Sequence, residues 1–167
     1  MRLVRYVHGG DESYGALKDE RIIDLPSLLR LKGRCAPKSL DELIISGLKI
    51  DEVENLIDEL SEEEIKRISI NEENTTLKAP IPSPPKIVCL GLNYKDHAEE
   101  SGAKIPDEPI IFMKPRTSIV GPQEDVVKPG FVKELDYEVE LAIIIGRKGK
   151  NISVSEAADY IFGYTVF

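Results

Sequence analysis

Residues 136–145 read Asp-Tyr-Glu-Val-Glu-Leu-Ala-Ile-Ile-Ile, and this stretch decides the fold that the sequence predicts. Its end, 141–145, is a short apolar run of the kind that forms a buried strand. We therefore predict a strand over 138–145. Alternate side chains of a strand share a face, so Glu138 and Glu140 point the same way with their carboxylates close together.

Two carboxylates placed this close repel each other unless a cation lies between them. Mg²⁺ and Mn²⁺ prefer carboxylate oxygens, so Glu138 and Glu140 are candidate metal ligands. Two carboxylates leave most of an octahedral site to other ligands, and the predicted site is therefore incomplete. The alternative is a solvated edge strand, although the adjoining apolar run favours a position near the core.

Upstream of this pair, residues 86–90 predict another strand, and residues 91–100 read Gly-Leu-Asn-Tyr-Lys-Asp-His-Ala-Glu-Glu. The second stretch predicts a turn that becomes a short helix by Lys95. His97 and Glu100 then stand at i and i+3 on one helix face, where a carboxylate orients an imidazole and raises its basicity. The pair is a candidate general base, and a surface pair without function is the alternative.

A third strand is predicted over residues 110–113, and Lys114 follows it. A lysine at this strand end can receive a substrate carboxylate. The alternative is a lysine whose stem is buried and whose ammonium lies in water. Tyr94, Arg116 and Tyr164 are further candidates for substrate binding.

The front of the chain predicts a small antiparallel sheet followed by helices, with strands over residues 2–7 and 22–25. Two serine–glutamate pairs have the spacing of a capping box, and each predicts a helix start. Between them lies an apolar helix face with the i, i+3, i+4, i+7 spacing. The capping pairs are Ser39 with Glu42 and Ser61 with Glu64, and the face consists of Val53, Leu56, Ile57 and Leu60.

Residues 71–85 lose this periodicity and carry prolines at 80, 82, 84 and 85. Proline stiffens an extended chain, so we predict a linker there. The prediction divides the chain into a small N-terminal α/β domain of sheet and helices over 1–80 and a mainly β domain over 81–167. The predicted fold class is α+β.

Composition excludes several classes of function. The formal net charge of −8 disfavours nucleic acid as a partner, because phosphate contacts need clustered Lys and Arg. No apolar run approaches the roughly 20 residues that cross a bilayer, so no membrane association is expected. The N-terminus lacks the pattern of a signal peptide, so we expect a cytoplasmic protein. Cys35 and Cys89 have no metal-site spacing and are expected to be buried or half-buried free thiols.

Taken together and in order, four motifs resemble the fumarylacetoacetate hydrolase family. The first is Gly-Leu-Asn-Tyr at 91–94 with the histidine and glutamate that follow it, and the second is Phe-Met-Lys-Pro at 112–115. The third is Asp-Tyr-Glu-Val-Glu-Leu at 136–141, and the fourth is Gly-Tyr-Thr-Val at 163–166. The resemblance covers residues 86–167, and the preceding part looks like the small N-terminal domain that many members carry.

This resemblance implies a mixed β-roll fold, a role in the catabolism of aromatic compounds and a homodimer. It also implies a Mg²⁺ or Mn²⁺ site, which Ca²⁺ can occupy in crystals, built from the two glutamates of a Glu-x-Glu strand and one later aspartate. Glu138 and Glu140 match the first two ligands, and Lys114 matches the lysine that faces the substrate. His97 and Glu100 match a pair carried on a lid helix. Asn93 and Tyr94 lead into that helix as candidate substrate contacts.

The family continues beyond Gly-Tyr-Thr-Val-Phe with an Asn-Asp motif that supplies the third ligand, whereas this sequence stops at Phe167. We therefore expect a fragment, or a chain that another polypeptide completes. The implied activity is hydrolysis of a C–C bond or isomerisation of a 2-oxo or enol acid. The implied relatives are 2-hydroxyhepta-2,4-diene-1,7-dioate isomerases and acylpyruvate hydrolases. The alternatives are oxaloacetate decarboxylation, a non-catalytic truncated paralogue that serves as an interaction module, and an acidic scaffold without metal.

Overall fold

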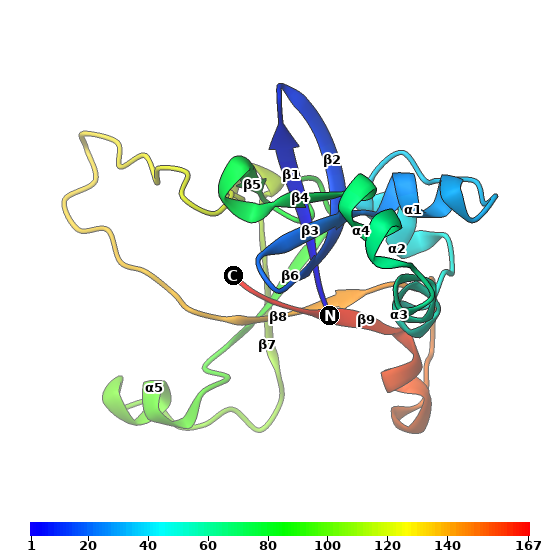
Figure 1. Cartoon of the computed structure of the whole chain (residues 1–167). Helices are drawn as coiled ribbons and strands as arrows, with labels where there is room; N and C mark the ends of the chain where they lie inside the picture. Colours follow the sequence, from blue (N-terminus) through cyan, green and yellow to red (C-terminus); the bar gives the residue numbers. More distant parts are fainter.

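The computed structural model describes residues 1–167 as one five-stranded sheet with helices, followed by two two-stranded ribbons (Figure 1). The four helices between residues 25 and 68 cluster near the large sheet, and the ribbons carry the later part of the chain. The predicted α+β class is therefore confirmed.

The large sheet is antiparallel and has the strand order β4-β3-β2-β1-β5. Strands β1 and β2 form a hairpin, and Gly9 and Gly10 close it with positive φ angles of 58° and 93°, which glycine adopts without steric cost. The bounds of the strands are β1 Arg2–His8, β2 Asp11–Lys18, β3 Arg21–Asp24, β4 Ser69–Asn71 and β5 Thr76–Lys78.

The prediction of a linker over residues 71–85 is wrong in its first half. β4 ends at Asn71, the 3-10 helix η1 (Glu72–Asn74) follows, and β5 then pairs with β1 at the edge of the sheet. Strands of three residues are too short to show an alternation of apolar and polar residues, so the sequence pattern could not predict β4 and β5. From residue 79 to 86 the chain contains no helix or strand.

Four helices lie between β3 and β4, namely α1 Leu25–Leu31, α2 Leu40–Ile45, α3 Ile50–Asp58 and α4 Glu62–Ile68. The capping box of Ser61 and Glu64 is complete, as predicted. At α2 the box is half formed. Ser39 accepts from the Glu42 amide, but the Glu42 carboxylate accepts from the amide of Lys38 at 2.8 Å instead of that of Ser39. No helix of the chain has both the length and the apolar character needed to cross a bilayer.

The core lies between the sheet and these helices. The predicted apolar face is confirmed, because Val53, Leu56 and Ile57 on α3 are all buried in the core, as is Leu60 just beyond its end. Of the buried apolar residues in the chain, all except Ala98 stand at or before position 79. Each large apolar side chain that is fully buried contributes about 1.5–3 kcal/mol, so the first half holds most of the burial energy.

The later part of the chain is built from two antiparallel ribbons, β6 with β7 and β8 with β9. Between β7 and β8, residues 119–140 run without helix or strand and form a long arm (Figure 1). The bounds of the elements are β6 Ile87–Gly91, α5 Lys95–Glu100, β7 Ile110–Lys114, η2 Arg116–Ser118, β8 Leu141–Ile145, η3 Val154–Tyr160 and β9 Ile161–Val166.

The strand predicted over 138–145 begins later, at Leu141. Its partner β9 runs antiparallel, and the last pairing joins the backbones of Glu140 and Phe167 by bonds of 2.7 and 2.9 Å. A strand needs a partner for its backbone hydrogen bonds, so the extended chain before Glu140 is not part of a sheet.

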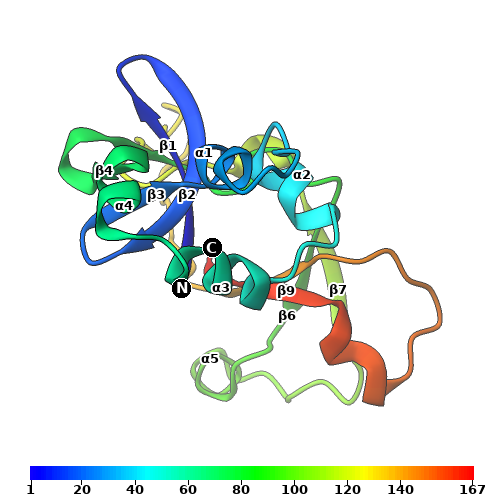
Figure 2. The same ribbon diagram turned by 45° about the vertical axis from the view of Figure 1, so that its right-hand side comes forward.

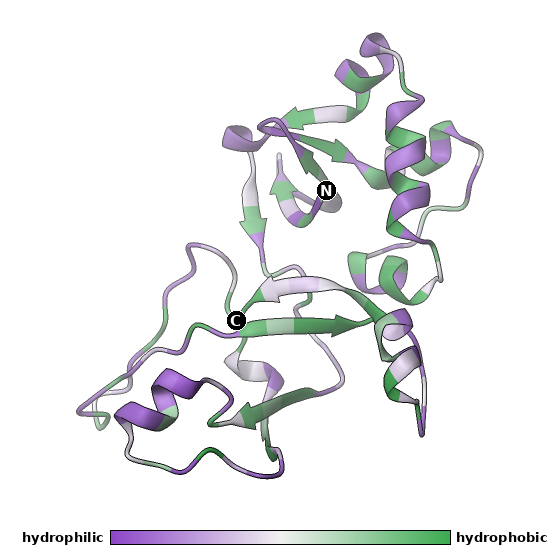
Figure 3. Cartoon of the chain, turned by 90° about the horizontal axis from the view of Figure 1, so that it is seen from below, coloured by the Kyte–Doolittle hydropathy of each residue, from purple (hydrophilic) through white to green (hydrophobic).

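The β8–β9 ribbon connects the two parts of the chain, and Figures 1 and 2 both place it beside α3. Its inner face packs Ile144 and Phe162 against the core. Its outer face is apolar yet exposed, with Ile143 51% and Tyr164 62% accessible, and Figure 3 shows the mostly apolar colouring of this ribbon beside the C-terminus. The front core therefore supports one face of the ribbon and leaves the other open.

Asp24 at the end of β3 accepts three hydrogen bonds, one from α1 and one each from β1 and β2. Its Oδ1 accepts from the Ser27 amide at 2.8 Å, which caps the helix, and its Oδ2 accepts from the hydroxyls of Tyr6 at 2.8 Å and Ser13 at 2.5 Å. Burial opposes ionisation of Asp24, but the three donors outweigh it and hold the pKa of this carboxyl below its usual value. Burial also raises the pKa of Tyr14, whose hydroxyl donates to the Pro37 carbonyl, to about 12.

Replacement of Asp24 by alanine is expected to lower the free energy of unfolding by about 2 kcal/mol at neutral pH, because a helix cap and two further bonds to a charged group are lost. The folded-state pKa of Asp24 lies below its unfolded value, so this stabilisation is present above the unfolded pKa. It disappears as the pH falls through the folded pKa. Urea unfolding of both proteins across the acid range tests this expectation. Asp58→Ala, which removes an exposed partner of Lys18, is the control and should change stability by less than about 0.5 kcal/mol.

Candidate functional site

Four of the predicted site residues meet at one place, although they come from three separate segments. The ammonium of Lys114 at the end of β7 donates to Oε2 of Glu138 on the chain before β8. The side-chain amide of Asn93, from the turn after β6, donates to Oε2 of Glu140 at 3.2 Å. Two cationic or polar donors thus face the two carboxylates of the Glu-x-Glu stretch.

Lys114 is positioned by the β6–β7 ribbon, in which it lies opposite Ile87. Pro115 follows it, and because proline has no N–H the strand ends there. The ammonium also lies 5.6 Å from the centroid of the Phe167 ring, within the range of a cation–π contact. The hydrogen bond to Glu138 raises the pKa of Lys114, against the effect of partial burial, and the charges of both glutamates add to the rise. Lys114 therefore stays charged.

Asn93 reaches Glu140 because the chain turns sharply at Leu92. The φ angle of Leu92 is 51°, in the left-handed region that a branched residue rarely adopts and that costs about 1 kcal/mol or more. This turn ends β6 and directs the next residue toward the chain before β8. Four other non-glycine residues of the chain have a similar positive φ, so the turn at Leu92 is significant here only because it positions Asn93.

The two glutamates differ in how firmly they are held. Glu140 is half-buried and is tied through its backbone to Phe167 and through its side chain to Asn93. The side chain of Glu138 is 55% exposed, and Lys114 is its partner. The expectation that both glutamates sit near the core is therefore wrong for Glu138, because no strand covers it.

His97 and Glu100 both lie on α5, which begins at Lys95 as the sequence predicts. Both are exposed, and no hydrogen bond or ion pair joins their side chains. Ala98 on the same helix is buried. Figures 1 and 2 show α5 at the end of the molecule away from the five-stranded sheet. The pairing of His97 with Glu100 stays a prediction.

Three other candidates lie outside the four-residue cluster. Arg116 is exposed on η2, and Tyr94 precedes α5 with 46% of its surface accessible. Tyr164 lies on the outer face of the β8–β9 ribbon opposite Ile143. None of the three makes a hydrogen bond to the cluster. Sequence reasoning missed Phe167, whose role depends on its register opposite Glu140 and has no local signal.

The two thiols take no part in this cluster's hydrogen bonds. Both are free, and Cys89 on β6 is half-buried, as expected. Cys35 is exposed, which contradicts the expectation of burial, because the loop between α1 and α2 carries it outward.

The oxygen atoms of the two glutamates are of the chemical type that a hard divalent cation prefers. Glu138 and Glu140 offer carboxylate oxygens, which Mg²⁺ and Mn²⁺ prefer. No group of three or more His, Cys, Asp or Glu side chains is arranged to hold a metal ion. The two glutamates therefore fit as part of a ligand set, with the remaining positions left to water, substrate or other groups.

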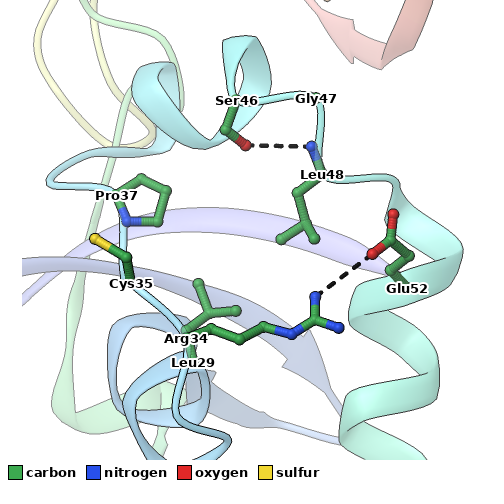
Figure 4. A pocket seen from close by; sticks show the side chains of 8 residues that line it. All are labelled: Leu29, Arg34, Cys35, Pro37, Ser46, Gly47, Leu48 and Glu52. Atoms are coloured by element: carbon green, nitrogen blue, oxygen red, sulfur yellow. Dashed lines mark hydrogen bonds and ion pairs between the residues drawn. The ribbon is translucent and has the colours of Figure 1, made fainter.

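A separate recess of about 340 Å³ lies among the front helices (Figure 4). Its charged groups are paired, since Nη1 of Arg34 lies 3.4 Å from Oε2 of Glu52. The hydroxyl of Ser46 likewise accepts from the amide of Leu48. None of the predicted site residues lines this recess, which is lined by Leu29, Arg34, Cys35, Pro37, Ser46, Gly47, Leu48 and Glu52.

Comparison with known proteins identifies similar chains. Residues 86–167 match the family described as fumarylacetoacetate (FAA) hydrolase, C-terminal. The fumarylacetoacetate hydrolase domain-containing protein 2 homolog of Dictyostelium discoideum is 42% identical over 172 residues, which make up 99% of this chain and 53% of that protein. The human oxaloacetate tautomerase FAHD2A, mitochondrial, is 50% identical over 91 residues, or 54% of this chain and 29% of that protein.

A solved structure also shares the fold. The maleylpyruvate hydrolase of Sphingobium sp. SYK-6, in complex with manganese(II) ion and pyruvate, superposes with a TM-score of 0.71 at 27% identity. The match covers 99% of this chain and 57% of that one. The chain spans about half the length of the Dictyostelium relative and of this structure, and less of the human relative.

Replacement of Asn93 by alanine is expected to loosen the turn between β6 and α5, because the bond to Glu140 is lost. An exposed side-chain hydrogen bond contributes modestly, so amide exchange over residues 92–101 should become about two- to fivefold faster. Hydrogen exchange followed by mass spectrometry measures this directly. Asn55→Ala on the exposed side of α3 is the control. Unchanged exchange in Asn93→Ala would show that Glu140 does not hold this turn.

Proposed function

Since residues 86–167 belong to the fumarylacetoacetate hydrolase family, we propose that the protein is a divalent-metal-dependent enzyme acting on 2-oxo acids or their enols. The reaction is hydrolysis of a C–C bond or isomerisation. The observation that carries the proposal is the convergence of Asn93, Lys114, Glu138 and Glu140 from segments far apart in the sequence. A purely structural role does not require two carboxylates to face an ammonium and an amide on an accessible surface.

In this proposal, Glu138 and Glu140 hold Mg²⁺ or Mn²⁺. When bound, such a cation acts as a Lewis acid that stabilises negative charge developing on the 2-oxo group. The similarity to a maleylpyruvate hydrolase in complex with manganese and pyruvate supports both the cation and the class of substrate. With two carboxylates, binding to these residues alone is weak.

The remaining residues of the chain bind the substrate and move protons. Lys114 pairs with a substrate carboxylate, since its charge is secured and its position at a strand end is fixed. His97, oriented by Glu100, transfers a proton or activates a water molecule. The segment over 95–108 closes on the bound acid and excludes water until it is needed. Asn93 fixes the start of that segment by its bond to Glu140.

A second candidate reaction is the tautomerisation of oxaloacetate, which is favoured by the human relative of that name at 50% identity over 91 residues. Moving a proton between carbon and oxygen uses the same base, His97, and the same stabilisation of negative charge, without breaking a C–C bond. Decarboxylation of oxaloacetate is a third reaction that starts from the same arrangement. Incubation with oxaloacetate and with an acylpyruvate separates these reactions by their products.

We further propose that the protein is cytoplasmic and forms a homodimer, with a domain boundary near residue 80. The burial pattern supports the boundary, because the buried core residues stand before it except for Ala98. The exposed apolar outer face of the β8–β9 ribbon supports a subunit contact. Gel filtration with light scattering tests the dimer.

Isothermal titration of the protein with Mn²⁺ tests the ligand assignment. A Glu138→Gln, Glu140→Gln double variant is expected to lose measurable affinity, because amides replace both charged donors. The matched control is Glu62→Gln, Glu63→Gln, which removes the same charge from the exposed start of α4 and should bind as the wild type does. Equal affinity in all three proteins would remove Glu138 and Glu140 from the metal site.

Turnover of a 2-oxo acid by a His97→Ala variant tests the proposed base. The rate is expected to fall by roughly two to four orders of magnitude, the range that general acid–base groups supply, with little change in metal affinity. Glu100→Gln should show a milder defect, because the ring remains but loses its orienting charge. The other histidine provides the control, since His8 lies on β1 and contacts the Asn74 carbonyl. Full activity in His97→Ala would exclude it as the base.

A further inference from the structure

The two glutamates of the site are held by partners of different kinds. Glu140 is fixed by neutral groups, namely the Asn93 amide and the backbone of Phe167, and its charge is not neutralised by them. Glu138 is paired with a full positive charge, the ammonium of Lys114. One of the two proposed metal ligands therefore already carries a cation that the chain supplies itself.

A carboxylate has two oxygens with about four lone pairs, so an ammonium and a divalent cation can both contact Glu138, but only with their positive charges a few ångströms apart. The contact of Lys114 is with Oε2 of Glu138, and the charge of Glu138 next to Glu140 favours any cation that can be placed there. Glu138 and Glu140 would hold a divalent cation, which would supply the positive charge that Lys114 now supplies and would repel the ammonium at short range. Binding of the cation therefore weakens the contact between Lys114 and Glu138 and favours a position of the ammonium farther from this carboxylate.

Lys114 has room to make this movement. Its side chain is 28% exposed, and its flexible stem extends from the fixed end of β7. The face of the Phe167 ring, 5.6 Å from the ammonium, offers a second position for the charge. An ammonium that has left Glu138 remains beside the site, where the carboxylate of an acid substrate can pair with it.

We propose that Lys114 is a built-in competitor for the cation at Glu138, which cation binding releases to receive the substrate carboxylate. This inference rests on the proposed function, in which Glu138 and Glu140 bind a divalent metal. It makes binding ordered, with the cation first and the acid second. In this order Lys114 opposes binding of the cation and favours binding of the acid. Its replacement should therefore raise the affinity for the cation and lower the affinity for the acid.

Titration of the intact protein with Mn²⁺ measures the first affinity. Lys114→Met and Lys114→Gln are expected to bind Mn²⁺ about 3- to 10-fold more tightly than the wild type. Two neutral variants are used so that a folding defect in one of them does not decide the result. Lys114→Arg keeps the charge and should bind no more tightly than the wild type. The control is Lys78→Met, because Lys78 on β5 forms a similarly exposed pair with Glu124 of the 119–140 arm, and it should leave the Mn²⁺ affinity unchanged.

Titration with pyruvate at saturating Mn²⁺ measures the second affinity, which should fall about 10-fold in Lys114→Met, since the partner of the carboxylate is gone. Weaker or unchanged Mn²⁺ binding in both neutral variants, or unchanged pyruvate binding, overturns the inference. Failure of the proposed function has a different signature. If wild type and Glu138→Gln, Glu140→Gln bind Mn²⁺ equally, the glutamates are not ligands. If the double glutamate variant binds Mn²⁺ more weakly than the wild type while the Lys114 variants bind it equally well, only the proposed competition by Lys114 is wrong.

Discussion

The later part of the chain is held in place by a core that the earlier part builds. The helices α1–α4 pack on the five-stranded sheet, and of the buried apolar residues only Ala98 lies beyond position 79. Ile144 and Phe162 attach the β8–β9 ribbon to that core. Because burial of apolar surface is the dominant favourable term in folding, the position of β8, and of the glutamates before it, depends on this contact.

The packing of the β8–β9 ribbon on the core also determines where the site residues lie. The register of β8 and β9 places Phe167 opposite Glu140, and the ring of Phe167 lies near the ammonium of Lys114. The β6–β7 ribbon contributes the lysine at its end and the strained turn at Leu92. Two ribbons that share no strand are thus joined through polar side chains, by Lys114 with Glu138 and by Asn93 with Glu140.

These polar contacts contribute little to stability. Ion pairs on exposed side chains contribute between zero and about 1 kcal/mol, and the pair of Lys114 and Glu138 is 28% and 55% exposed. The network around Asp24 differs, because there the carboxyl is partly buried, caps a helix and links two strands to it. Its effect is structural, and no feature of it points to a ligand.

The sequence by itself determined the features that local rules govern. The face of α3, the capping box at Ser61, the start of α5 at Lys95 and the strand before Lys114 all follow from patterns within a few residues, because side-chain periodicity and capping act at that range. The motifs also identified the family, and with it the four residues that meet. The division near residue 80 and the roles of His97 and Glu100 stay predictions.

Tertiary structure alone decided which distant segments meet. The three-residue strands β4 and β5 exist because β3 and β1 offer them free edges, and a pattern of three residues has no period to recognise. β8 begins at Leu141, and its pairing with β9 is followed by the backbone bonds between Glu140 and Phe167. The contact of Asn93 with Glu140 spans 47 residues and that of Lys114 with Glu138 spans 24. No local propensity encodes such contacts, since they depend on how two ribbons are placed by packing and backbone pairing.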